Sequence, residues 1–224
     1  MWKVVRYTLI AVVILLAVAG IGVFVFYRAT QHVPDFYTQE LAVAPETQES
    51  DSDLMLKQAT TLHNELHRRC QWKEVITAKA INAWLAVDLP KNHPELLPPG
   101  MHDPRVRIGP EGITTACRLD YRTFHGVISL QVSAFVESAN VIGLRVHKAR
   151  LGAVPWSLDP VLKGISDAAR QNNVHIVWRQ IDGDPVALLT LTPVNGGHKN
   201  VVHIDTISLE EGQLVVAGTT EVAK

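Results

Sequence analysis

Two histidines four positions apart are the strongest candidates for chemistry in this chain. They stand in the stretch His63–His67, written HNELH, and helical spacing places both imidazoles on one face. Metalloproteases use such a pair to hold zinc, with a glutamate next to a histidine as the general base. Here Glu65 lies midway between the two histidines and turns about 160° away from them. The pattern therefore misses the zinc signature.

A zinc site also needs a third ligand, and the spacing of the remaining histidines does not mark one. They are scattered over predicted loops and strands, at His93, His102, His125, His147, His175, His198 and His203. We therefore predict no metal site.

Nucleophilic catalysis has no marked residues either. The chain contains no G-x-S-x-G elbow, and Cys70 and Cys117 lack the sequence context of catalytic cysteines. Asp182 and Asp184 stand in a predicted turn, where acidic residues are ordinarily solvated. We expect a protein that is not an enzyme and that holds no cofactor.

Tryptophans are the remaining candidates for a site. Aromatic rings with one polar edge suit amphiphilic ligands, so Trp84, Trp156 and Trp178 are our candidates for lining an apolar groove. Packing in the core is the alternative, and periodicity does not separate the two.

The N-terminal residues predict a membrane anchor. Between Tyr7 and Tyr27 there is no charged side chain, and a helix of about 20 apolar residues spans the hydrocarbon core. A cleavable signal peptide is the alternative, with small residues at Ala17–Ala19, but the apolar run continues well beyond that point. Lys3 and Arg6 precede the span and favour a cytoplasmic N-terminus. The remainder of the chain is then expected outside the membrane.

Composition suggests three regions in the chain. The anchor occupies 1–28, and 29–52 is rich in acids, glutamine and serine, which predicts an extended, solvated tether. Residues 53–224 then form one extracytoplasmic domain. With 21 basic and 22 acidic residues, and no basic run beyond the short HRR at 67–69, we expect no nucleic-acid partner.

Helices are predicted in three places. Apolar residues at steps of four and three follow Ser52, a suitable N-cap, up to Cys70. A second helix starts after the N-cap Thr77 and is expected to end at Pro90. A third starts at Asp159–Pro160, after a break in the strands at Gly152. The region 88–104 contains five prolines and predicts a loop, either a lid or a clamp.

After Pro104 the texture predicts antiparallel strands. Residues 128–136 alternate between a wholly apolar face and a mixed face, and Asp182-Gly183 and Glu211-Gly212 are hairpin signals. The run Val186–Leu191 is apolar almost throughout, so we expect that strand to be covered on both faces. Strands and helices together predict an α+β fold.

The two cysteines leave two possibilities open. Cys70 and Cys117 could form a disulfide in an oxidising cell envelope. Alternatively they are two small buried apolar residues, since Cys117 shares a strand face with Ile113 and Thr115.

Several short motifs resemble a known family. They are ITAKAINAWL, with Ile76, Thr77, Asn82, Ala83 and Leu85; the break at Gly152 and Pro155 into the helix from Pro160; and Trp178 with Asp182–Val186. Over 75–192 the chain resembles the YpmS-type family of anchored extracytoplasmic bacterial proteins. More loosely it is similar to the tubular lipid-binding, BPI-like domains. The proline-rich insertion at 89–104 departs from that pattern.

This resemblance implies a fold and a role. It implies a curved antiparallel sheet packed with two or three helices, behind an N-terminal transmembrane helix in the bacterial cell membrane. The domain would lie on the extracytoplasmic or periplasmic side and bind a lipid or other amphiphile in an apolar groove. The alternative is a structural or adaptor domain without a ligand, whose partners are other envelope proteins.

Overall fold

The structure, a computed structural model, describes most of the chain after the first 23 residues. The described ranges are 24–66, 68, 70–121, 124–138, 140–171, 174–190, 195–196 and 198–222. Within them the protein is α+β, with antiparallel strand pairs and helices, as the sequence predicted. No helix in these ranges is long and apolar enough to cross a membrane. The predicted span lies mostly in 1–23, outside the described residues, and stays a prediction.

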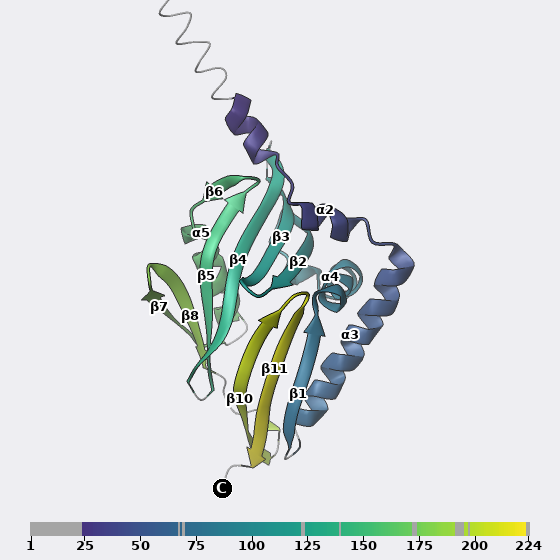
Figure 1. The fold of residues 1–224 in the computed structure, drawn as a ribbon, viewed down its shortest axis with the longest axis vertical. Coiled ribbons are helices and arrows are strands. Elements are labelled where there is room, and N and C mark those ends of the chain that lie inside the picture. The colour runs from purple at the N-terminus through teal and green to yellow at the C-terminus, as the bar shows by residue number, and fades with distance from the viewer. Residues whose placement is uncertain are drawn as a thin grey trace, which may run out of the picture.

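The larger sheet has seven strands in the order β2-β3-β4-β5-β8-β7, with β6 paired to β5 (Figure 1). The first four strands form the predicted meander. The strands are β2 (Met101–Gly109), β3 (Gly112–Tyr121), β4 (Phe124–Ser138), β5 (Val141–Leu151), β6 (Val154–Trp156), β7 (Ile176–Ile181) and β8 (Asp184–Thr190).

Two turns of this sheet are set by positive backbone angles. Asp182 and Gly183 join β7 to β8 with φ of 52° and 89°, as a two-residue hairpin requires. At the end of β5, Gly152 has φ of 59° and releases the chain into β6, as the sequence predicted. In β8, Val186, Ala187 and Leu188 are all buried, which confirms that this strand is covered on both faces.

The smaller sheet has four strands in the order β1-β11-β10-β9. They are β1 (Gln71–Thr77), β9 (Asn195–Gly196), β10 (His198–Glu210) and β11 (Gln213–Val222). The β10–β11 hairpin turns at Glu211-Gly212, as predicted. Its tip meets the larger sheet where β2 ends, because the N–H of Gly212 donates to the carbonyl of Ile108 (2.9 Å).

Two long helices pack beside the junction of the sheets. They are α3 (Pro45–Leu66) and α4 (Ala78–Asn92). Thr77 caps α4 as predicted, since its hydroxyl accepts from the N–H of Ala80 (3.1 Å). Pro90 does not end α4 but lies in its last turn, where the missing N–H removes only one helical bond. A short 3-10 helix, η1 (Pro94–Leu96), follows in the proline-rich region.

Residues 29–52 differ from the expected extended tether. Residues 24–30 are helical, α2 (Asp35–Leu41) follows, and α3 begins well before Ser52, which is a buried residue inside the helix. Tyr37 of α2 is 1% exposed and packs against Ala116 and Val127 of the larger sheet. The segment is therefore helical and packed on the sheet, not extended and solvated as expected. Its polar composition did not reveal that a single aromatic residue would anchor it. The division into anchor, tether and domain stays a prediction.

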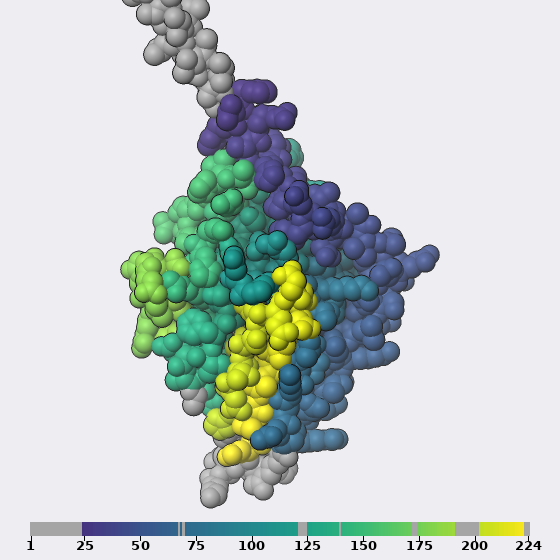
Figure 2. Space-filling model, viewed as in Figure 1, coloured from purple at the N-terminus to yellow at the C-terminus, as the bar shows by residue number. Residues whose placement is uncertain are grey.

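The chain from the first described helix docks on the turn after β5. The carbonyl of Ala29 accepts from the N–H of Ala153 (2.8 Å), and Thr30 is buried. The residues that follow, in purple and indigo in Figure 2, lie against the upper part of the molecule, where strands of the larger sheet are drawn in teal.

Strand register divides the larger sheet into two faces. We call the apolar face the one that carries Ile128, Leu130, Val132, Ala134 and Val136 of β4 and the residues paired with them. The polar face is the opposite one, with Ser129 and Gln131 of β4 and their pairs. This alternation confirms the predicted apolar and mixed faces. The last helix, α5 (Asp159–Gln171), lies on the apolar face, and α2 lies on the polar face.

Candidate functional site

The apolar face beneath α5 is the first candidate site. In-register rows such as Trp178–Ala187–Leu144–Ala134 run across β7, β8, β5 and β4 with no polar side chain. All five β4 residues that define this face are only partly buried. A central strand of a well-covered sheet normally buries such residues completely, so this face is incompletely covered.

The helix α5 carries a matching apolar side. Val161, Leu162 and Ile165 are spaced for one helix face, and all three are again only partly buried. A side-chain hydrogen bond from Trp178 Nε1 to Ser166 Oγ (2.8 Å) ties the helix to the sheet. The helix and the sheet thus present apolar surface to each other with few polar contacts between them. Such a boundary suits a flexible apolar ligand such as an acyl chain.

Two of the three candidate tryptophans belong to this face. Trp178 on β7 pairs with Ala187, and Trp156 on β6 pairs with Ala149, so both lie on the apolar face. Trp84 lies on α4, beside the opposite edge strand β2, and its ring is 6.0 Å from that of His93. The structure therefore brings Trp156 and Trp178 to one face and leaves Trp84 elsewhere.

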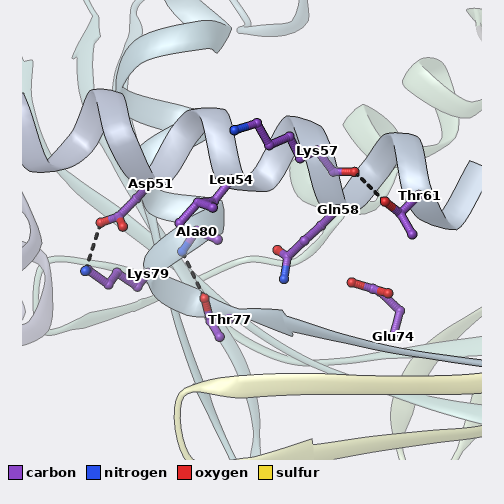
Figure 3. A pocket seen from close by; sticks show the side chains of 9 residues that line it. All are labelled: Asp51, Leu54, Lys57, Gln58, Thr61, Glu74, Thr77, Lys79 and Ala80. Carbon is purple, nitrogen blue, oxygen red and sulfur yellow. Dashed lines mark hydrogen bonds and ion pairs between the residues drawn. The ribbon is translucent and has the colours of Figure 1, made fainter.

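A second cavity, of about 450 Å³, lies between α3, β1 and the start of α4 (Figure 3). Some of its polar groups have partners, whereas Gln58 Oε1 is buried without one among the described residues. Lys79 Nζ pairs with Asp51 (3.0 Å), and Gln58 Nε2 donates to the carbonyl of Val75 (3.4 Å). Burial raises the pKa of Glu74, and the nearby carboxylate of Glu65 raises it further.

A third cavity, of about 320 Å³, lies on the polar face where the chain enters α2. We call it the basic pocket. Its lining comes from the segment before and at the start of α2 and from four strands: His32, Pro34, Asp35, Phe36, Arg107, Thr114, Ser129, Gln131, Lys148, Arg150 and Gly152. Three of these side chains are cationic and one is a carboxylate.

Strand register explains how these cations meet. Arg107, Thr114, Gln131 and Lys148 form one continuous row across β2, β3, β4 and β5. In the next row Ser129 pairs with Arg150. Neighbouring strands are about 4.8 Å apart, so long side chains from β2 and β5 reach over the short ones between them.

The histidine pair and the two cysteines can be placed only in part. His67 lies outside the described residues, and within the described ranges no group of three histidine, cysteine or acidic side chains is placed to hold a metal ion. Cys70 and Cys117 are both free thiols. Burial raises the pKa of the Cys117 thiol to about 11.

Comparison with protein families, with curated proteins and with solved structures gave no match for this chain. The YpmS-type and BPI-like resemblance therefore rests on the short motifs alone.

Proposed function

We propose that this protein binds a lipid or similar amphiphile between α5 and the apolar face, and that it does so on the extracytoplasmic side of a membrane to which residues 1–28 anchor it. No catalytic role is part of this proposal. The observation that carries it is the partial exposure of the whole apolar row of β4 beneath a helix that is itself apolar on the same side.

The physical argument concerns the cost of leaving this surface uncovered. Each Å² of apolar surface withdrawn from water contributes roughly 25 cal/mol, before the cost of ordering the ligand. An acyl chain lying along the β4 row would cover side chains that the helix leaves accessible. Trp156 and Trp178 supply aromatic edges at the margin, where a polar headgroup meets water.

A photoreactive fatty acid carrying a diazirine tests this proposal on the full-length chain. After illumination, we expect the label on peptides from β4, β7 and α5. Leu54 and Leu56 of α3 are exposed apolar residues away from this face and report nonspecific labelling. The Ala134→Phe variant fills the apolar row, and it should reduce labelling of these peptides while leaving α3 unchanged.

A second variant helps to distinguish lost binding from lost folding. Ile165→Ser weakens the apolar side of α5 without adding volume, and it should also reduce labelling. Thermal melting of both variants shows whether the fold persists. Equal labelling of α3 and the apolar face, or labelling that neither folded variant lowers, would instead favour the adaptor role.

A further inference from the structure

The basic pocket has an unusual balance of charge. Arg107, Lys148 and Arg150 form no ion pair with a carboxylate among the described residues, although Asp35 also lines the cavity. The side chains of Thr114, Ser129 and Gln131, which lie between the cations, make no hydrogen bond within the described part of the chain. The lining therefore carries three exposed cationic side chains against one carboxylate, together with donors that have no partner among the described residues.

Two cations next to the pocket on the same face do have carboxylate partners. Arg118 on β3 pairs with Asp103 (3.4 Å). Arg145 on β5 pairs with Asp184 through Nε (2.7 Å) and with Asp182 (3.3 Å). The cations that line the cavity have no carboxylate partner among the described residues, so they are free to bind an anion from outside the chain. Arg105 lies on the same face and also has no carboxylate partner among those residues, but it is buried and its guanidinium donates to the carbonyl of Pro104 (2.7 Å).

The guanidinium of Arg107 is positioned by an aromatic ring. Its Cζ lies 5.6 Å from the centroid of Phe36, at the start of α2. A cation held over a ring face keeps its donors free for another ligand. Arginine donors in a planar fork suit the oxygens of a phosphate group, and Lys148 adds a compact point charge.

The pocket also lies close to the N-terminal end of the described chain. His32 and Pro34, which line it, follow directly after the helix at 24–30, and Gly152 of its wall contacts the carbonyls of Ala29 and Thr30. Only a few residues separate this cavity from the end of the predicted membrane span at Tyr27. Anionic headgroups would be within its reach.

We propose that the basic pocket binds a phosphate group, carried either by the headgroup of an anionic lipid or by a soluble phosphate ester. The site lies on the opposite face of the sheet from α5 and does not rest on amphiphile binding there. A volume of about 320 Å³ admits a phosphate together with a small polar group.

The test uses the full-length chain in a neutral detergent. Calorimetric titration with glycerol 1-phosphate and with inorganic phosphate examines the soluble source. For the lipid source, the protein is reconstituted in phosphatidylcholine mixed with phosphatidylglycerol and repurified, and mass spectrometry measures the ratio of the two lipids that remain bound. Phosphatidylglycerol enrichment with weak binding of the soluble compounds identifies a headgroup site, and the reverse identifies a soluble ligand.

Variants connect either result to the pocket. Lys148→Gln with Arg150→Gln should weaken phosphate binding about tenfold or more, or abolish the lipid enrichment. The control Lys91→Gln with Lys163→Gln removes the same charge from exposed helix positions and should bind like the wild type. Lys148→Arg with Arg150→Lys keeps the charge and should retain binding, which separates lost charge from lost fold. Binding that is absent in the wild type, or equal in the glutamine pair and its control, overturns the proposal.

Discussion

Asn82 on α4 binds the backbone of Val106 on β2 through both ends of its side-chain amide. Nδ2 donates to the carbonyl of Val106 (2.8 Å), and Oδ1 accepts from its N–H (2.7 Å). Because β2 is an edge strand, the amide takes the place of a neighbouring strand at that position. Asn82 is buried, so water does not replace these bonds easily.

Replacing Asn82 with alanine should therefore destabilise the fold strongly. Two backbone groups of Val106 lose their partners, and we expect the free energy of unfolding to fall by about 2–4 kcal/mol. Denaturant titration measures the change. Asn92→Ala is the matched control, because Asn92 bonds to Asp88 at the exposed end of the same helix and should change stability by less than about 1 kcal/mol. Similar losses in both variants would contradict this account of the contact.

Two glycines should respond to alanine in opposite directions. A Cβ on Gly218 of β11 would lie 2.1 Å from the carbonyl oxygen of His203 and 2.5 Å from the Trp72 ring. We expect Gly218→Ala to cost about 1–3 kcal/mol. Gly164 in α5 has nothing within 4 Å of a built Cβ, so Gly164→Ala should gain about 0.5–1 kcal/mol through helix propensity. Melting temperatures that move in the same direction would contradict this prediction.

Asp184 should make the free energy of unfolding depend on pH in the acid range. A hydrogen bond from Arg145 lowers the pKa of this carboxyl below its usual range, with a smaller effect from His147. A lowered pKa in the folded state contributes stability that is present above the unfolded-state value, about 3.9, and is lost as the pH falls through the folded-state value. Asp184→Asn should be less stable than wild type at pH 7, and the difference should shrink below about pH 4.

A matched aspartate gives the control for this pH dependence. Asp53 on α3 is exposed and forms no ion pair with another described residue, so Asp53→Asn should follow the wild-type curve. A constant difference between Asp184→Asn and wild type from pH 7 to pH 3 would count against the assigned role.

Cys117 reports on the apolar face. Its pKa of about 11 leaves roughly 0.1% thiolate at pH 8, so the Cys70→Ser variant should react slowly with a thiol reagent and much faster once unfolded. Cys117 pairs with Ile128 on the apolar face, so a bound amphiphile should slow the folded-state reaction further. Fast labelling of the folded variant, at a rate unchanged by fatty acid, is the opposing result.

The contact between Trp178 and Ser166 should hold α5 in place. Trp178→Phe keeps an aromatic side chain, although a smaller one, and removes the donor, so we expect faster hydrogen exchange in α5 together with a loss of about 1 kcal/mol. Trp84→Phe is the control, since its indole N–H has no partner among the described residues. Unchanged exchange in α5 would show that other contacts fix the helix.

Local chemistry explains what the sequence predicted well. Asp182-Gly183 supplies the two positive backbone angles of a two-residue hairpin, and Gly212 supplies the one positive angle of the β10–β11 turn. Alternation along 128–136 assigns each residue to a face without knowledge of its partner strands. Thr77 caps a helix through a bond three residues away. These signals act over a few residues, so they are visible in one sequence.

Long-range pairing explains what the sequence did not show. Tyr37 lies in a polar segment, and its packing on Ala116 and Val127 holds that segment on the sheet together with the neighbouring Phe36 and Leu41. The basic pocket escaped notice because its cations are far apart in the chain, although Lys148 and Arg150 alternate along β5 as residues of one face do. Only the pairing of β5 with β4, and of β4 with β3 and β2, places Lys148 and Arg150 on the same face as Arg107.

The docking of Ala29 and Thr30 at Gly152 also couples the helix at 24–30 mechanically to the larger sheet. A Cβ at Gly152 would lie 2.5 Å from the carbonyl oxygens of both residues, so only glycine lets the helix at 24–30 seat against this turn. Rotation or tilt of that helix would then be transmitted to β5 and β6 as torque. If the predicted anchor precedes it, bilayer thickness and helix tilt would set the orientation in which the sheet faces its surroundings.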